Sequence, residues 1–186
     1  EDLWAHLSRY ERETEGEALA IPHNGNLSKG YMFISEDSEG RPLSQIYAKN
    51  RSRWEPLYEV TQIKGDSETH PFLSPHDKFA DYETWRSFFE VEPVNDRRKY
   101  EYARSALKLG LDQQAKLGVN PFKFGMIGST DAHGALSSVA ENNYTGKDKW
   151  MEPAPERITK RAYGGEYDGI VYRTIPGWQL NAAGYA

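Results

Sequence analysis

The stretch that decides the fold is GMIGSTDAH, residues 125–133, in which an apolar run leads into a turn of small residues and an Asp-x-His pair. The run predicts a buried strand that delivers a carboxylate and an imidazole to the end of a sheet. Side chains two residues apart on an extended segment point to the same side, so Asp131 and His133 can converge on one ion. An Asp/His pair that only caps a turn is the alternative that this motif leaves open.

An earlier segment, LAIPHNGN at residues 19–26, repeats the order of a short apolar run, a histidine at its carboxyl end and turn residues. Catalytic groups gather at the carboxyl ends of strands in parallel α/β sheets, so the two segments together favour one shared site. As a metal ligand, His23 needs its second ring nitrogen held by a partner, and Asn24 or a backbone carbonyl can serve. A turn histidine without a ligand role stays open as well.

Helices that alternate with strands, without an internal repeat, predict a parallel α/β architecture. The apolar spacing predicts helices over residues 2–14, near 41–52 and over 99–117. Besides the strand that leads to Asp131, strands are expected over residues 17–22, 57–63 and 169–174. Irregular segments are expected over residues 72–99 and 141–165.

The composition excludes several classes of protein. The chain has 186 residues, which suits one domain, and its net charge of −5 argues against a nucleic-acid binder that relies on a basic face. It contains no cysteine, which excludes disulfides and thiolate zinc sites and is compatible with either cytoplasm or periplasm. No apolar run approaches the roughly 20 residues that span a bilayer.

Four further polar residues are candidates for the site. Glu59 lies mid-strand in an apolar context, where a carboxylate is costly unless it pairs with a cation or a donor, and the alternative is a solvent-facing edge strand. Glu68 and His70 belong to a polar loop that could bind substrate, although a solvated loop is the more frequent outcome. Ser129 lacks a Gly-x-Ser-x-Gly elbow, so we expect it to support the site rather than to act as a nucleophile.

The order of Pro-His-Asn after a strand, Tyr-Glu-Val on a strand and Gly-Ser-Thr-Asp-Ala-His resembles the carboxyl-terminal half of the PHP (polymerase and histidinol phosphatase) superfamily. More closely, the chain resembles an uncharacterised branch that is known only as a domain of unknown function. The resemblance covers most of the chain and includes the strings IPHNGN at 21–26, GDSETHP at 65–71, GVNPFKFG at 118–125, ENNY at 141–144 and GK at 146–147.

The resemblance implies part of a distorted (β/α)7 TIM-like barrel with parallel strands, of which residues 1–186 are the carboxyl-terminal portion. It implies two or three divalent metal ions (Zn, Mn or Fe), with His23, Asp131 and His133 as metal ligands. Asp131, His133 and Glu59 are then the catalytic residues. The residues expected to contact substrate are Asn24, Glu68, His70 and Ser129. The superfamily begins with a His-x-His pair that has no counterpart here, so the amino-terminal portion of the barrel is expected to be missing.

PHP proteins are typically phosphoesterases, so the resemblance implies a metal-dependent hydrolase of a small phosphate ester that acts through a metal-activated water. No basic phosphate clamp is evident, and no Lys or Arg can be assigned to the substrate. Hydrolysis of another ester or an amide is one alternative, and a non-catalytic binding or scaffold role, suited to the abundant Trp and Tyr, is another. No nucleic-acid or membrane partner is expected, and the sequence leaves the oligomeric state and the compartment open.

Overall fold

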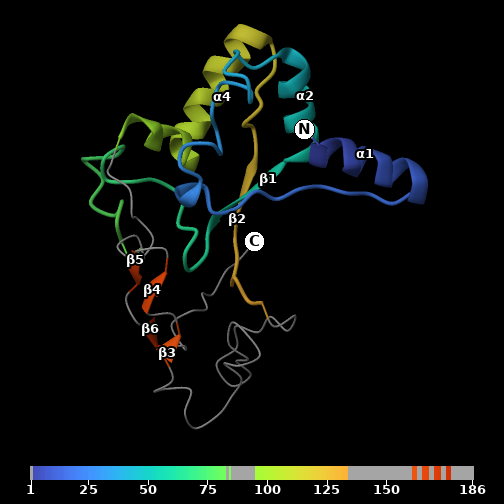
Figure 1. Ribbon diagram of the computed structural model, residues 1–186. Coiled ribbons are helices and arrows are strands. Elements are labelled where there is room, and N and C mark those ends of the chain that lie inside the picture. Colours follow the sequence, from blue (N-terminus) through green and yellow to red (C-terminus); the bar gives the residue numbers. More distant parts are fainter. Residues whose placement is uncertain are drawn as a thin grey trace.

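The computed structural model describes residues 2–82, 84 and 95–133, and the backbone of four short strands between 161 and 176 (Figure 1). The α-helices of these residues are α1 (Asp2–Thr14), α2 (Gln45–Trp54) and α4 (Ala103–Leu117), and the 3-10 helices are η1 (Gly25–Leu27) and η2 (Asp96–Tyr100). The strands are β1 (Leu57–Thr61), β2 (Gly125–Gly128), β3 (Arg161–Ala162), β4 (Gly165–Tyr167), β5 (Ile170–Tyr172) and β6 (Ile175–Pro176).

β1 and β2 form a parallel pair, with Leu57 opposite Gly125 and Glu59 opposite Ile127. Helix α4 lies between them in the sequence, so the three elements form a β-α-β crossover unit. The prediction of parallel strands joined by a helix is confirmed for this unit. Because the two strands run in the same direction, the segments that follow each of them leave from the same edge of the sheet.

The segment of residues 17–22 was expected to be a strand, and this is wrong, although the segment does run beside β1. The Ala20 N–H donates to the Trp54 carbonyl at 2.7 Å, and the Glu59 N–H donates to the Pro22 carbonyl at 3.0 Å. Pro22 has no N–H of its own, so the segment cannot continue a regular ladder of hydrogen bonds. It nevertheless brings His23 toward the carboxyl end of β1.

The core lies between α4 and one face of β1. Phe33, Tyr58 and Phe122 are at most 1% exposed, and the rings of Phe33 and Tyr58 pack edge-on with centroids 5.0 Å apart. Ala103 and Ala106 of α4 are fully buried in the same cluster. Large aromatic side chains thus supply much of the buried apolar area in a chain with few aliphatic residues.

Helix α4 begins later than the expected residue 99, because Tyr102 is extended (φ −117°, ψ 141°) and separates it from η2. This conformation directs the first amides of α4 toward the loop after β1. The Ala103 N–H donates to the Ser67 carbonyl at 2.8 Å, and the Arg104 N–H donates to the Glu68 carbonyl at 3.1 Å. Carbonyl groups of a distant loop therefore satisfy the amides at the start of the helix.

The first helix is confirmed as α1, and α2 starts after the expected residue 41 because Ser44 caps it. The Ser44 Oγ accepts the Tyr47 N–H at 3.1 Å, a common way to begin a helix. The Gln45 side chain donates to the Leu117 carbonyl at 2.9 Å, which ties the start of α2 to the end of α4. Among the helices that the structure describes, none has the length and apolar character to cross a membrane.

In the carboxyl-terminal part, β5 confirms the strand expected over residues 169–174. The pairs β4–β5 and β3–β6 are antiparallel, unlike the parallel strands expected for the barrel. β3 lies within the segment 141–165 that was expected to be irregular, and residues 141–160 lie outside the described residues. The parallel sheet of the described residues has two strands, so the (β/α)7 barrel stays a prediction.

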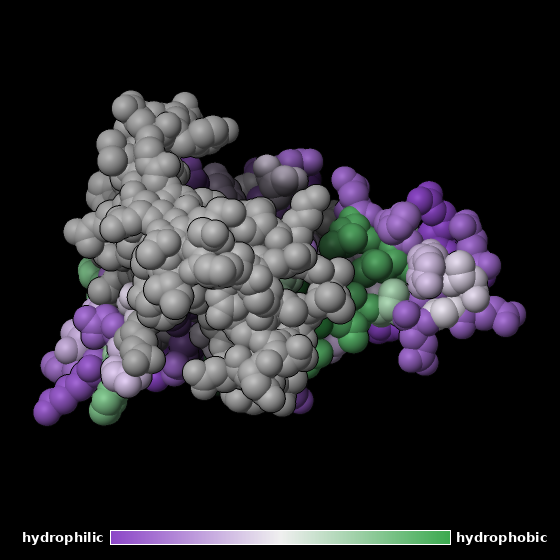
Figure 2. Space-filling view, turned by 90° about the horizontal axis from the view of Figure 1, so that it is seen from below, coloured by the Kyte–Doolittle hydropathy of each residue, from purple (hydrophilic) through white to green (hydrophobic). Residues whose placement is uncertain are grey.

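Apolar side chains reach the surface on the flank of β1 that faces away from β2. Leu19 and Ile21, from the segment beside β1, are both exposed. Figure 2 shows apolar surface in this region, between the end of the molecule where α1 projects and the residues drawn in grey. This flank therefore contributes less buried apolar area than the face of β1 that is covered by α4.

Candidate functional site at the carboxyl ends of β1 and β2

Asp131 lies at the centre of a cluster of three side chains. The His133 Nε2 is 2.9 Å from the Asp131 Oδ1, and the ammonium group of Lys64 contacts the Asp131 Oδ2. The Asp131 side chain is 9% exposed, whereas those of Lys64 and His133 are 26% and 51% exposed. We call these residues the Asp131 cluster. Asp131 and His133 meet, as the Asp-x-His spacing indicated, and their role as metal ligands stays a prediction.

The turn after β2 positions Asp131. The Ser129 N–H donates to the Thr61 carbonyl at 3.0 Å, which extends the contact between the two strands. The Ser129 Oγ accepts the Asp131 N–H at 3.4 Å, so this hydroxyl supports the turn. Asp131 has φ 54°, in the left-handed region that few residue types other than Gly, Asn and Asp adopt readily. Such backbone conformations cluster at functional sites.

Lys64 comes from the loop after β1, and its backbone is held on both sides. The Lys64 N–H donates to the Gln62 Oε1 at 2.9 Å, and the Asn26 Nδ2 donates to the Lys64 carbonyl at 2.9 Å. The Gln62 Nε2 in turn donates to the Asn24 Oδ1 at 2.7 Å. A Cβ at Gly65 would lie 2.4 Å from the Asn24 Oδ1, so any larger residue there would force Asn24 to move. The loop is therefore packed against residues 24–26.

Ser67 joins the same loop to η1 and α4. It is fully buried, its Oγ donates to the Asn26 Oδ1 at 2.9 Å, and its carbonyl accepts the Ala103 N–H. The Tyr58 hydroxyl also lies here, since a Cβ at Gly25 would be 2.2 Å from it. Burial raises the pKa of Tyr58 from 10.0 to about 12. The region beneath the loop is thus closely packed and largely shielded from solvent.

His23, the expected third metal ligand, is exposed after the segment beside β1. Within the part of the chain that the structure describes, its side chain makes no hydrogen bond or ion pair and is not gathered with Asp131 and His133 into a metal-binding group. Asn24, expected to contact substrate or to hold His23, has φ 56° and gives its side-chain oxygen to Gln62. The Asn24 side chain therefore helps to pack the loop, and its expected contact with substrate stays a prediction.

Glu68 forms an exposed ion pair, and its expected contact with substrate stays a prediction. The Glu68 Oε1 accepts from the Arg104 Nε at 2.9 Å, and the Arg104 Nη1 reaches the Asp77 Oδ2 at 2.6 Å. The Phe79 amide and the Arg104 guanidinium hold the pKa of Asp77 below its usual value, and the two carboxylates raise the pKa of Arg104. The group links the loop after β1 to the first turn of α4.

His70, another residue expected to contact substrate, is 5% exposed. Its Nδ1 accepts the Phe72 N–H at 3.0 Å, and its ring lies 5.6 Å from the ring of Tyr102 between centroids. His70 therefore packs within the turn that follows the loop, and its expected contact with substrate stays a prediction.

The donor set can be compared with what a divalent ion requires. Imidazole nitrogen and carboxylate oxygen are suitable ligands for zinc or manganese, and the Glu59 Oε1 is buried without a hydrogen-bond partner among the described residues. However, these residues contain no group of three or more His, Cys, Asp or Glu side chains that could hold an ion. Lys64 also occupies one oxygen of Asp131. The described side chains therefore do not form a metal centre by themselves.

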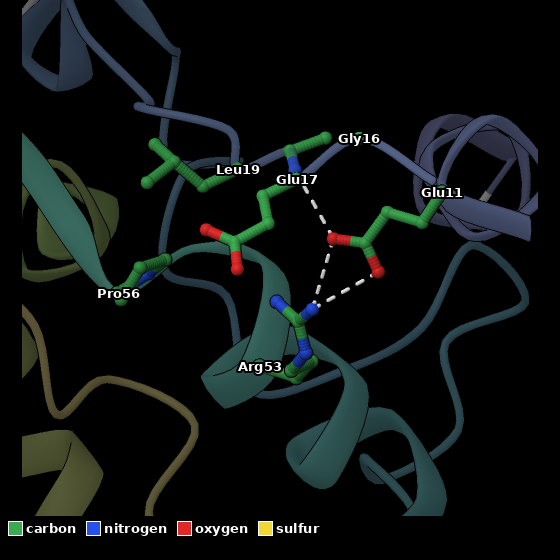
Figure 3. Close-up of a pocket in the computed structure, with 7 residues that line it drawn as sticks. Glu11, Gly16, Glu17, Leu19, Arg53 and Pro56 are labelled. Carbon is green, nitrogen blue, oxygen red and sulfur yellow. Dashed lines mark hydrogen bonds and ion pairs between the residues drawn. The ribbon is translucent and has the colours of Figure 1, made fainter. Parts of the chain in front are cut away.

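A hollow lies at the other end of β1, beside Pro56 (Figure 3). It has a volume of about 500 Å³ and is open to solvent. The Arg53 Nη2 is 3.0 Å from both carboxylate oxygens of Glu11, and the Ala18 N–H donates to the Glu11 Oε1 at 3.1 Å. Figure 3 shows Glu11 and Arg53 pointing toward each other. Because these charges satisfy one another, we assign no chemistry to this hollow.

Lys64 is the residue of the Asp131 cluster that the sequence did not reveal. A single lysine in a polar loop has no pattern that separates it from any surface lysine. Its one distinguishing feature is its place at the end of an expected strand, directly before Gly65. That position indicates the correct edge of the sheet but not the partner.

A family model described as "Protein of unknown function (DUF3604)" matches residues 1–186. No curated protein matches the chain, and no solved structure matches it either. The expectation of a domain of unknown function is thereby confirmed, while the link to the PHP superfamily stays a prediction. Since the match extends over all the residues, the chain belongs to the DUF3604 family.

Proposed function

We propose that this chain contributes to a hydrolytic site for a small phosphate ester, of the metal-dependent kind that the PHP resemblance implies. The observation that carries the proposal is the Asp131 cluster, in which side chains from the ends of two parallel strands meet beside solvent. Parallel α/β proteins gather their catalytic groups at this edge of the sheet.

Asp131 and His133 have complementary roles in the proposal. A carboxylate that accepts an imidazole N–H fixes the orientation and tautomer of the ring and raises its basicity. The ring of His133 is half exposed, so a proton or an ion can reach it. Such an ion would supply Lewis acidity toward the phosphoryl oxygens. His23 and Glu59 are further candidates to hold it, together with donors outside the described residues.

Two contacting donors are too few for a tight metal centre. We therefore expect residues 1–186 alone to bind Zn²⁺ or Mn²⁺ weakly, with the metal lost on dialysis. Equilibrium dialysis with metal analysis by atomic emission measures this directly. Tight binding at a whole-number ratio would show that this chain completes the ligand set.

The function itself is tested by a hydrolysis screen on the natural protein that contains residues 1–186. Aryl phosphate, aryl sulfate and anilide substrates are offered after metal removal and again after addition of Mn²⁺ or Zn²⁺. We expect turnover of the phosphate ester that depends on added metal. Turnover of the sulfate or the anilide alone would show that the substrate is a sulfate ester or an amide and not a phosphate ester. No turnover with any substrate and metal would contradict the proposal.

A non-catalytic binding surface is the second candidate, favoured by exposed aromatic residues in the turns after the loop. Phe72, Phe79 and Tyr82 are all exposed, and the rings of Phe79 and Tyr82 pack edge-on at 6.2 Å. Exposed aromatic faces of this kind suit sugar rings. Saturable quenching of aromatic fluorescence by an oligosaccharide, abolished by Phe79→Ala, would support this candidate, and its absence would remove it.

A further inference from the structure

We propose that Lys64 binds an anionic oxygen of the substrate, which makes the Asp131 cluster a site for a tetrahedral oxyanion such as phosphate. The inference rests on the proposed function for the substrate class and assigns the cationic group that the sequence did not reveal. Lys64 is suited to this role by its unused hydrogen-bond donors, its fixed backbone and the surroundings of its ammonium group.

The ammonium group has capacity for a ligand. It carries three N–H donors, and Asp131 is the one acceptor that it contacts among the described residues. The side chain is 26% exposed, so the remaining donors are within reach of solvent. A phosphate oxygen can take the place of water on these donors and gain a charge-assisted hydrogen bond.

The lysine is also positioned before any ligand arrives. Surface lysines are flexible, and ordering them on binding costs conformational entropy. Here the backbone of Lys64 is bonded through its N–H to Gln62 and through its carbonyl to Asn26, and its ammonium group rests on Asp131. Both ends of the side chain are therefore held, which lowers the ordering cost.

The charge of Asp131 does not prevent an anion from approaching. One carboxylate oxygen faces the Lys64 ammonium and the other faces the His133 ring, and the side chain is only 9% exposed. An anion that arrives from solvent thus meets the two nitrogen groups before it meets the carboxylate. Because the Lys64 ammonium directly contacts the Asp131 carboxylate, its positive charge offsets most of the repulsion between that carboxylate and the anion.

The small hollow that Lys64 helps to line is not the place for the anion. Its volume is about 10 Å³, which has room for roughly one water molecule. Asp66 lines the same hollow, and its negative charge disfavours an anion further. We therefore expect the anion on the solvent side of Lys64, where His133 is exposed.

Titration of the metal-stripped protein with inorganic phosphate tests the inference, with backbone amide shifts followed by NMR at constant ionic strength. We expect saturable shifts around Lys64 and Asp131, an affinity about tenfold weaker or worse in Lys64→Gln, and near-normal affinity in Lys64→Arg. Lys123→Gln is the matched control, because it removes the same charge from an exposed residue just before β2. Sulfate should compete with phosphate, and chloride should not.

Absence of saturable phosphate binding by the wild-type protein would overturn the inference, as would equal affinity in Lys64→Gln and wild type. A second measurement needs no variant. Reductive methylation of wild-type protein, read by mass spectrometry, should be slowed at Lys64 by phosphate and unchanged at Lys123. Equal rates at Lys64 with and without phosphate would also overturn the inference.

These outcomes are separate from those of the hydrolysis screen, because the phosphate titration uses neither metal nor turnover. Phosphate binding through Lys64 without hydrolysis would leave the anion site in place and remove the proposed reaction. Metal-dependent hydrolysis with an unchanged phosphate affinity in Lys64→Gln would leave the reaction and remove the role of Lys64.

Discussion

An ion pair lies near each end of β1, and each pair connects segments that are far apart in the sequence. The two pairs differ in how far their carboxylates are exposed to solvent. At the amino end, Arg53 and Glu11 are 56% and 23% exposed, and Glu11 also accepts a backbone amide. At the carboxyl end, Asp131 is 9% exposed and contacts two nitrogen groups. An exposed, mutually satisfied pair ties helices together, whereas a sheltered carboxylate beside accessible nitrogen groups can also serve chemistry.

The largest expected effect comes from removing one charge at the carboxyl end. In the natural protein, Asp131→Asn should reduce hydrolysis by about 10²–10³-fold, the usual cost of losing one electrostatic group in a site. Asn accepts the left-handed backbone at this position, so the fold should persist. Turnover and thermal midpoint are measured for Asp131→Asn and for Glu11→Gln, which removes a carboxylate charge from the other end. Unchanged turnover in Asp131→Asn would break the comparison.

The burial of Tyr58 beneath the carboxyl-end loop predicts a loss of stability at high pH. The pKa of Tyr58 is about 12 in the folded protein and 10.0 without burial, the value expected in the unfolded chain. As the pH rises, the unfolded chain therefore releases this proton before the folded protein does. The contribution of Tyr58 is fully present below pH 10 and is lost as the pH rises toward 12. The free energy of unfolding should therefore fall by roughly 2 to 3 kcal/mol more in wild type than in Tyr58→Phe.

Urea unfolding at several pH values between 9 and 12 measures this difference. Other tyrosines and lysines titrate in the same range, and the comparison with Tyr58→Phe cancels their common effect. Parallel pH profiles for the two proteins would show that the Tyr58 hydroxyl is accessible to water.

Two glycines probe how tightly each end is packed. A Cβ at Gly65 would lie 2.4 Å from the Asn24 Oδ1 and 3.0 Å from the Gln62 Cγ, so Gly65→Ala should destabilise the protein by about 1–3 kcal/mol. A Cβ at Gly125 would meet the end of the Leu57 side chain at 3.1 Å, which can move, and the Pro56 carbonyl oxygen at an ordinary contact distance of 3.9 Å. Thermal or urea unfolding should therefore show that Gly65→Ala is clearly less stable than Gly125→Ala. Equal free energies of unfolding for the two variants would show that the loop around Gly65 adjusts freely.

The smallest effect is expected at the amino end. Glu11→Gln should cost less than about 1 kcal/mol, because the pair with Arg53 is substantially exposed and solvent screens it. The loss should shrink further in 0.5 M salt, roughly as the Debye length shortens. Urea unfolding at low and high salt checks both statements. A larger, salt-independent loss would contradict the assignment of an exposed, screened pair, because Gln still offers a carbonyl oxygen to the Ala18 amide.

Several features followed from local sequence because their causes are local. The apolar run before Asp131 predicted a strand, although β2 is not buried as expected, since Gly125 and Met126 are exposed. Asp131 and His133 do contact each other, but through a turn after β2 in which Asp131 is left-handed, and not through the alternation of an extended segment. The helix pattern predicted α1 and most of α4. The late start of α4 could not be predicted, since it depends on a distant loop whose Ser67 and Glu68 carbonyls bond the first amides of the helix.

The sequence by itself determined the types of the main elements, the absence of thiolate chemistry and the edge at which polar groups would gather. Hydrophobic periodicity and side-chain alternation are properties of neighbouring residues, so they can be read along the chain. Only the tertiary structure decided which groups meet there. Lys64 and Asp131 are 67 residues apart, and their contact exists because β1 and β2 pair in parallel and release both following loops at one edge.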